Sequence, residues 1–205
     1  MIKLGSLIQE SSSDNLIVVD VQPEYEKNIN FNLYKFFEFL LHSNYKKVYY
    51  LYNGRDTLGM CSEEELKDWM FQSYDYDEKY FDILNTFNFY DKGYAYFRYC
   101  MDSNIDDSDI ITLVKFMYKH NIRDSRDFEE RDWDRFIEFH GKNNIRELLE
   151  FSDDMVNIPD LMDYLTQITG KIFVVGGGVN ECLREVVIAL KSLNKTPNFI
   201  NKWIY

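Results

Sequence analysis

The chain has 205 residues, and hydrophobic residues make up 45% of them, which suits a single domain with a sizeable core and argues against disorder. Its formal net charge of −12 at pH 7 argues against a nucleic-acid partner, because a phosphate-binding surface needs an excess of lysine and arginine. Cys61, Cys100 and Cys182 are odd in number and widely spaced, which predicts a reducing, cytoplasmic compartment, and no apolar run is long enough for a membrane partner.

Residues 1–14 are expected to form a short flexible leader, because the segment is mixed in composition and ends in a serine run. Within it, Ile8-Gln9-Glu10 resembles the Leu/Ile-x-Glu triplet after which the prohead proteases of large tailed phages cut the leaders of head-packaged proteins. That resemblance implies cleavage after Glu10 and a location in the host cytoplasm or the virion. A flexible N-terminus with no such processing is the alternative.

The first predicted strand covers residues 16–21, LIVVDV, an apolar run typical of a buried parallel strand. Asp20 lies near its carboxyl end, where open α/β sheets place reactive groups. A buried aspartate is costly unless it has a partner. Asp20 is therefore either a site residue or the cap of a turn.

The next elements are a helix, a strand, a second helix and a third strand. Apolar spacing predicts the first helix over residues 32–42, and the strand follows at residues 47–52. A capping box opens the second helix, which runs from Ser62 to about residue 72. The third strand covers residues 87–90, so Lys92 lies just beyond a strand end, either turned inward to a carboxylate or in solvent.

Residues 94–151 are predicted to be helical, with candidates at 94–103, 108–120 and 129–139. We interpret residues 104–156 as a helical elaboration beside the sheet, within one domain that spans residues 15–205. A further helix at 161–169 leads into a fourth strand, and residues 198–205 could add an edge strand.

The stretch from Lys171 to Leu193 combines a buried strand, three glycines and a helix that Asn180 is expected to cap. Cys182 falls in the first helical turn, where free N–H groups and the helix dipole favour a thiolate and an oxyanion. A dinucleotide fingerprint would need glycine at Glu181, whose charge would repel a pyrophosphate. The remaining alternative is a buried, inert thiol.

Taken together, these motifs resemble those of the isochorismatase-like cysteine hydrolases, the superfamily that includes nicotinamidases and carbamoyl amidohydrolases. The order Asp, Lys, Cys fits that family. The matching segments are Val18-Val19-Asp20-Val21-Gln22 for the N-terminal strand motif, Lys92-Gly93-Tyr94-Ala95-Tyr96-Phe97 for the central motif, and Gly176 followed six residues later by Cys182.

The resemblance implies an α/β fold, a three-layer open and mostly parallel sheet with helices on both faces. It says little about residues 104–156, where the sequence pattern alone predicts the helical insertion. It also implies a cofactor-independent enzyme in which Cys182 attacks a small amide, Asp20 transfers the proton and Lys92 holds both charges in place. Gly178 and Val179 would form the oxyanion and substrate-binding turn, with the Cys182 N–H as a further donor and a cis Gly178–Val179 peptide. Family members often form dimers or tetramers, so the resemblance implies a homo-oligomer.

Several residues depart from the family pattern. Residues 52–56, YNGRD, lack the Asp and His pair with which nicotinamidases bind a metal, so no metal is expected. Val179 stands where threonine is common, and Glu181 would raise the pKa of the neighbouring thiol. The alternative is therefore a catalytically inactive member of the fold, used as an interaction protein and packaged in a phage head.

Overall fold

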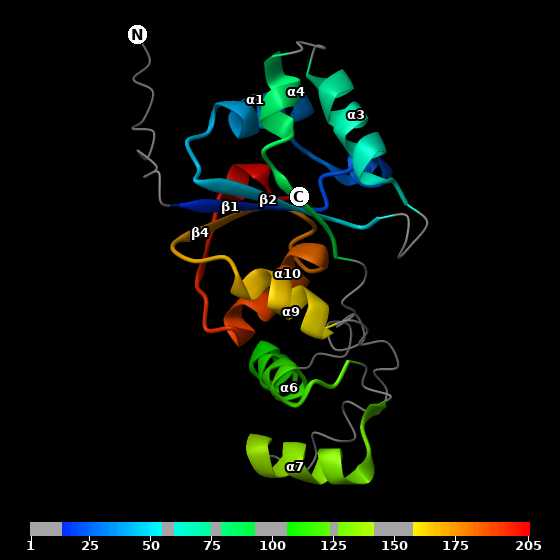
Figure 1. The fold of residues 1–205 in the computed structure, drawn as a ribbon, viewed down its shortest axis with the longest axis vertical. Coiled ribbons are helices and arrows are strands. Elements are labelled where there is room, and N and C mark those ends of the chain that lie inside the picture. Colours follow the sequence, from blue (N-terminus) through cyan, green and yellow to red (C-terminus); the bar gives the residue numbers. More distant parts are fainter. Residues whose placement is uncertain (1–13, 55–59, 75–78, 93–105, 124–126, 142–157) are drawn as a thin grey trace.

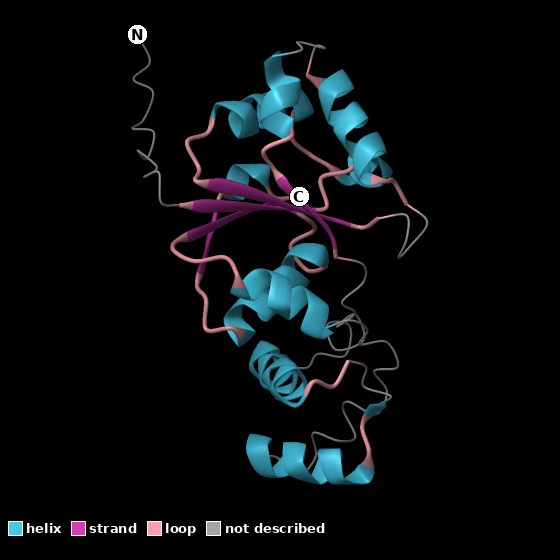
Figure 2. Ribbon diagram, in the orientation of Figure 1, coloured by secondary structure: helices cyan, strands magenta, loops and turns pink. Residues whose placement is uncertain are grey.

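The computed structural model describes residues 14–54, 60–74, 79–92, 106–123, 127–141 and 158–205. Its centre is a five-stranded sheet in the order β3-β2-β1-β4-β5, and every neighbouring pair is parallel. Helices cover both faces of this sheet (Figure 2). The predicted three-layer α/β fold is confirmed. The strands are β1 (Asn15–Val19), β2 (Lys47–Tyr52), β3 (Asn88–Asp91), β4 (Ile172–Gly176) and β5 (Pro197–Phe199).

β1 lies at the middle of the sheet, and both it and β4 are buried along their whole length. Continuous apolar composition is what a parallel strand covered on both faces requires. Val19 pairs in register with Leu51 of β2 and with Gly176 of β4. The carboxyl ends of these three strands are therefore level, and the residues that follow them start from one edge of the sheet.

One helical layer consists of α1 (Leu33–His42), α3 (Glu63–Ser73) and α4 (Lys79–Leu84). Its core joins aromatic residues of α1, such as Phe36 and Phe37, to Leu16 and Val18 of β1. Before α1 the chain makes a short 3₁₀ helix, η1 (Pro23–Asn28).

The other layer consists of α9 (Ile158–Thr166) and α10 (Cys182–Ser192), with α6 (Asp107–His120) packed against both. Ile17 and Val19, the alternate residues of β1, face this second core. α7 (Glu130–His140) packs on α6 and lies farthest from the sheet (Figure 1). The described part of the predicted elaboration, α6 and α7, is thus helical, but it packs outside the layer of α9 and α10 rather than beside the sheet.

The predicted caps and bounds hold for most elements. The Asn32 side chain accepts the Lys35 N–H at the start of α1, and both bonds of the Ser62–Glu65 capping box are present. η1 and α4 were not predicted, because six residues are too few to show a helical period. The expected edge strand is shorter than residues 198–205, because the chain leaves β5 after Phe199 and turns into η3 (Asn201–Trp203).

Several expectations lie outside the described residues: the leader up to residue 13 with its cleavage site at Glu10, the motif residues 93–97, the helix at 94–103 and Cys100. Within the described ranges, none of the helices combines the length and the apolar character needed to cross a bilayer.

Candidate active site

Asp20 follows β1 directly, in a backbone conformation that only a few non-glycine residues adopt. Its φ is +49°, and its side chain is fully buried. The Asp20 N–H donates to the Leu51 carbonyl at 2.9 Å, and the Tyr205 hydroxyl donates to the Asp20 carbonyl at 2.7 Å. Strain of this kind persists only where the surroundings enforce it, and here hydrogen bonds from two directions do so.

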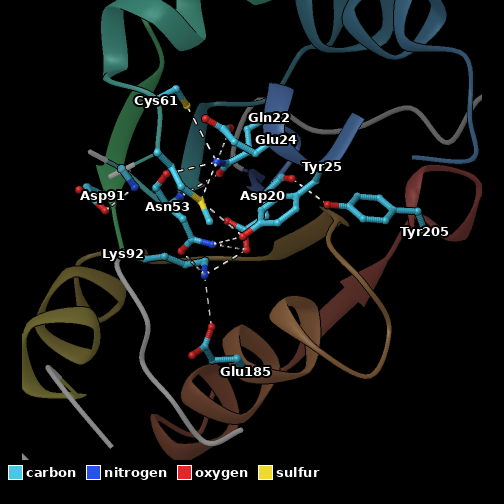
Figure 3. A network of polar contacts seen from close by, with 12 residues as sticks. Asp20, Gln22, Glu24, Tyr25, Asn53, Cys61, Asp91, Lys92, Glu185 and Tyr205 are labelled. Carbon is cyan, nitrogen blue, oxygen red and sulfur yellow. Dashed lines mark hydrogen bonds and ion pairs between the residues drawn. The ribbon is translucent and has the colours of Figure 1, made fainter. Parts of the chain in front are cut away.

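Lys92 is turned inward rather than into solvent. The backbone N–H of Lys92 donates to the Tyr52 carbonyl at 2.9 Å and so continues the pairing of β2 with β3. Its Nζ lies 3.0 Å from Asp20 Oδ2 in a fully buried ion pair (Figure 3). Burial lowers the pKa of the ammonium, but the charges of Asp20 and Glu185 outweigh it, so the pKa is raised. Lys92 therefore stays protonated across the physiological range.

Asn53, the residue after β2, joins these two charges and was not predicted as a site residue. Its Oδ1 accepts from Lys92 Nζ at 2.9 Å, and its Nδ2 donates to Asp20 Oδ2 at 3.3 Å and to the Tyr25 hydroxyl at 3.0 Å. The Gln22 side chain brackets the Asn53 backbone, accepting its N–H at 2.9 Å and donating to its carbonyl at 3.2 Å. Asn53 is fully buried and held at both ends.

The glycine turn after β4 approaches β1 very closely. Gly176 and Gly177 have φ values of +77° and +67°, and a Cβ on Gly176 would lie 2.3 Å from the Val19 carbonyl oxygen. These glycines reverse the chain, and the described residues contain no cis peptide bond, so the expected cis Gly178–Val179 bond is wrong. The Val179 N–H donates to the Tyr205 carbonyl at 3.1 Å, so this N–H is already used in a hydrogen bond within the fold.

The N-cap residue of α10 is not the one predicted. Glu181, not Asn180, is the N-cap residue, and its side chain makes no capping bond. The Gly178 carbonyl instead accepts the N–H groups of Glu181 at 3.0 Å and Leu183 at 3.2 Å. Because this backbone closure replaces a side-chain cap, the helix begins at Cys182 itself.

Cys182 is half-buried and interacts with both Asp20 and Lys92. Burial and the Asp20 charge raise the pKa of its thiol, Lys92 opposes them, and Glu185 adds to the rise. Asp20 Oδ2 is bound to Lys92 and Asn53, whereas Oδ1 is buried and has no hydrogen-bond partner among the described residues. The structure thus brings together the three predicted residues and leaves one carboxylate oxygen open to take a proton.

Glu185 is a second site residue that was not predicted. It lies three residues after Cys182, a spacing that puts both on one face of α10, and its Oε2 is 3.3 Å from Lys92 Nζ. Burial, with a smaller contribution from Asp20, raises the pKa of its carboxyl group to about 7 against the opposing effect of Lys92. The acid expected to act on the thiol, Glu181, is exposed instead.

Comparisons with known proteins identified no relative of this chain. No family model, no curated protein and no solved structure matched this chain. The argument for function therefore depends on the geometry of the site.

A cavity of about 560 Å³ lies along α10, next to the glycine turn. Arg184 on its wall is held by Asp107 of α6, with Nη2 to Oδ1 at 2.6 Å. Val179, 58% exposed, contributes its side chain to this wall. The cavity adjoins the turn that carries Cys182, although Asp20, Lys92 and Cys182 are not among its lining residues. Those are Asp107, Val179, Asn180, Leu183, Arg184, Val187, Phe199, Asn201 and Ile204.

A metal site was not expected. Across the residues that the structure describes, no three His, Cys, Asp or Glu side chains gather in a way that could hold a metal ion. Asn53, the first residue after β2, is engaged with Asp20 and Lys92.

Proposed function

We propose that this chain is a cofactor-independent cysteine hydrolase that acts on a small amide or a related C–N bond. The observation that carries the proposal is the buried Lys92–Asp20 ion pair of 3.0 Å, which meets the first turn of the helix that begins with Cys182. A candidate nucleophile, base and cation, each following a different strand, come together at this edge of the sheet. Their meeting fits the logic of an activated thiol.

The reaction would begin with transfer of the thiol proton of Cys182 to Oδ1 of Asp20. The sulfur attacks the carbonyl carbon, a C–S bond forms, and the carbonyl oxygen takes the negative charge. As the C–N bond breaks, Asp20 returns the proton to the departing nitrogen and leaves a thioester. Water then attacks the thioester and gives a proton to Asp20. The C–S bond breaks, and Asp20 passes this proton to the departing sulfur as the acid product is released.

Electrostatics explain how a thiol with a raised pKa could still react. Transfer of the proton to Asp20 moves a negative charge from the carboxylate to the sulfur without changing the total charge. The Lys92 ammonium pairs with the carboxylate and also acts on the thiol, in a buried region where charges interact more strongly than in water. The N–H groups of Gly178 and Cys182, at the positive end of α10, are suited to the developing oxyanion.

The partner in this proposal is a small-molecule substrate. The cavity beside the glycine turn is of a size that small-molecule sites commonly have. A reducing compartment, such as the cytoplasm of a phage host, would keep Cys182 as a free thiol. The homo-oligomer implied by the family resemblance belongs to the same proposal.

A second candidate function follows from the thiol itself. The raised pKa of Cys182 is what an inert buried cysteine would have, which favours a non-catalytic interaction protein of the same fold, packaged in a phage head. The two candidates differ in the reactivity of one sulfur.

The rate of Cys182 alkylation by iodoacetamide against pH, read by peptide mass spectrometry, tests the proposal. Cys61 is the internal reference, because burial and Glu24 raise its pKa to about 12. A free thiol has a pKa of about 8.5. We expect Cys182 to react at pH values well below this pKa, and to lose this reactivity in Asp20→Asn and Lys92→Met. Lys67→Met replaces a partly buried lysine of α3 that is paired with Glu63. It is the matched control and should react like the wild type.

If Cys182 reacts like an ordinary or an inert thiol in the wild type, the hydrolase proposal is wrong. A search for a protein partner would then follow. If Cys182 is activated, a panel of small amides is the next measurement, with Cys182→Ser as the inactive reference.

A further inference from the structure

The ammonium of Lys92 is surrounded by acceptors. A lysine side chain has three N–H bonds to donate. Three oxygens from three elements lie within reach of Nζ: Asn53 Oδ1 at 2.9 Å, Asp20 Oδ2 at 3.0 Å and Glu185 Oε2 at 3.3 Å (Figure 3). A thiolate at Cys182 would have to displace one of them to receive a hydrogen bond from Lys92.

Glu185 is the acceptor best placed for this exchange. It lies on the same face of α10 as Cys182, whereas Asp20 and Asn53 are tied to each other and to the sheet. Its side chain is buried, and its neighbours Val186, Val187 and Ile188 are part of the core. An apolar residue would pack at this position without the desolvation that a carboxylate suffers, so packing does not explain Glu185.

We propose that Glu185 is a positioning residue that controls the thiol of Cys182 through Lys92. While Glu185 is ionised it holds the ammonium, and when it is protonated it releases one N–H of Lys92 to the sulfur. This inference rests on the proposed function, because it gives Glu185 a role in activating that thiol.

The charges of the site fit this exchange. With Asp20 and Glu185 ionised and Lys92 protonated, the buried cluster carries one net negative charge before any thiolate forms. Protonation of Glu185 removes this excess charge. A thiolate at Cys182 would then form beside Asp20 and Lys92, whose charges sum to zero. The carboxyl of Glu185 takes up its proton close to neutral pH, because burial raises its pKa to about 7.

Other charged groups on the neighbouring elements are engaged elsewhere. Arg184, the residue before Glu185, bonds to Asp107 of α6 at 2.6 Å, and Asp109 of α6 pairs with His140 at 3.0 Å. On α9, Asp163 accepts from the Tyr118 hydroxyl at 2.7 Å, and Asp160 lies near Arg123 at 3.6 Å. The groups that act on Glu185 are therefore Lys92 and Asp20.

The test compares the pH profile of Cys182 alkylation in the wild type, Glu185→Gln and Glu181→Gln. We expect the wild-type rate to decline above about pH 7, where Glu185 ionises, and the Glu185→Gln rate to continue without this decline. At about pH 8 the variant should react about tenfold faster than the wild type, because one pH unit beyond a pKa leaves about a tenth of the group protonated. Glu181→Gln removes an exposed charge next to Cys182 and should keep the wild-type profile.

Each outcome separates the two proposals. If Cys182 is activated and its profile is the same in the wild type and Glu185→Gln, the role of Glu185 is overturned and the hydrolase proposal stands. If wild-type Cys182 behaves as an ordinary thiol even at about pH 6, where Glu185 is protonated, the hydrolase proposal itself fails.

A second measurement covers the case in which Glu185→Gln does not fold. Infrared difference spectra of the wild-type chain, with glutamate carboxyl groups labelled with carbon-13, should show a protonated glutamate that ionises between about pH 6 and about pH 8. Glu181→Gln should keep this band. A spectrum without it overturns the inference.

Discussion

Glu185 makes the stability of the molecule depend on pH. Its carboxyl has an ordinary pKa of 4.5 when exposed, and burial raises that value to about 7 in the folded chain. The folded state therefore binds this proton more tightly than the unfolded state. The resulting stabilisation is complete below about pH 4.5 and is lost as the pH rises through about 7.

We expect the free energy of unfolding of the wild type, relative to Glu185→Gln, to fall by roughly 3 kcal/mol between about pH 4.5 and about pH 8, from a shift of about two and a half pKa units. Urea unfolding at both ends of this range measures the difference. Glu181→Gln is the control and should run parallel to the wild type. Equal pH dependence of the wild type and Glu185→Gln would mean that Glu185 has the same pKa in the folded and unfolded chain, which contradicts the prediction.

The sequence was informative about Asp20, Lys92 and Cys182 because each follows a strand, and parallel strands deliver their carboxyl ends to one edge. The same reasoning could have included Asn53, which follows β2 in the same manner. Glu185 could have been found from its three-residue spacing to Cys182 on a helix. What no pattern revealed was which of the two nearby glutamates is buried, because that depends on the rotation of α10 against the sheet.

At the scale of elements, the contact between β4 and β1 at Gly176 positions the turn that leads to Cys182. We expect Gly176→Ala to destabilise the chain much more than Gly141→Ala, although both glycines have positive φ. An added Cβ at Gly141 meets no heavy atom within 4 Å, so only backbone strain of about 1–2 kcal/mol applies there. At Gly176 the Val19 carbonyl oxygen would lie 2.3 Å away, and the strands must separate.

Thermal unfolding of the two alanine variants measures this difference. Alkylation of Cys182 provides a second measurement, because Gly176→Ala should also move the turn relative to Asp20. Equal losses of stability in both variants would contradict the close approach.

The elements with strong local signals were predicted well, and those that depend on the tertiary context were not. β1 and β4 are uniformly apolar, and the capping box fixed the start of α3. The cap of α10 was misassigned because a backbone carbonyl, that of Gly178, takes the place of a capping side chain. A residue-type preference cannot reveal such a bond.

At the scale of the whole molecule, α7 is separated from the site by α6. Phe136 of α7 is fully buried, and its ring lies 5.2 Å from that of Phe116 of α6. We expect Phe136→Ala to lower stability by about 3–5 kcal/mol and to expose α7 to hydrogen exchange while β1 and β4 stay protected. Phe139→Ala removes a half-exposed ring of the same helix and is the matched control.

Hydrogen–deuterium exchange resolved by peptide measures this prediction, and Cys182 alkylation should not change in either variant. Loss of protection throughout the sheet in Phe136→Ala would show that α7 and the sheet unfold as one unit.

The central place of β1 also has a consequence for synthesis on the ribosome. β1 can pair with β2 early, but its other neighbour, β4, emerges only near the end of the chain. Until then the second edge of β1 is an open, apolar template for other chains, which is a hazard for aggregation. Lys92 and Asp20 are both made long before Cys182 and Glu185. The nascent chain therefore acquires Cys182 and Glu185 only after Asp20 and Lys92 have been made, so the cluster can close only when α10 packs onto the sheet.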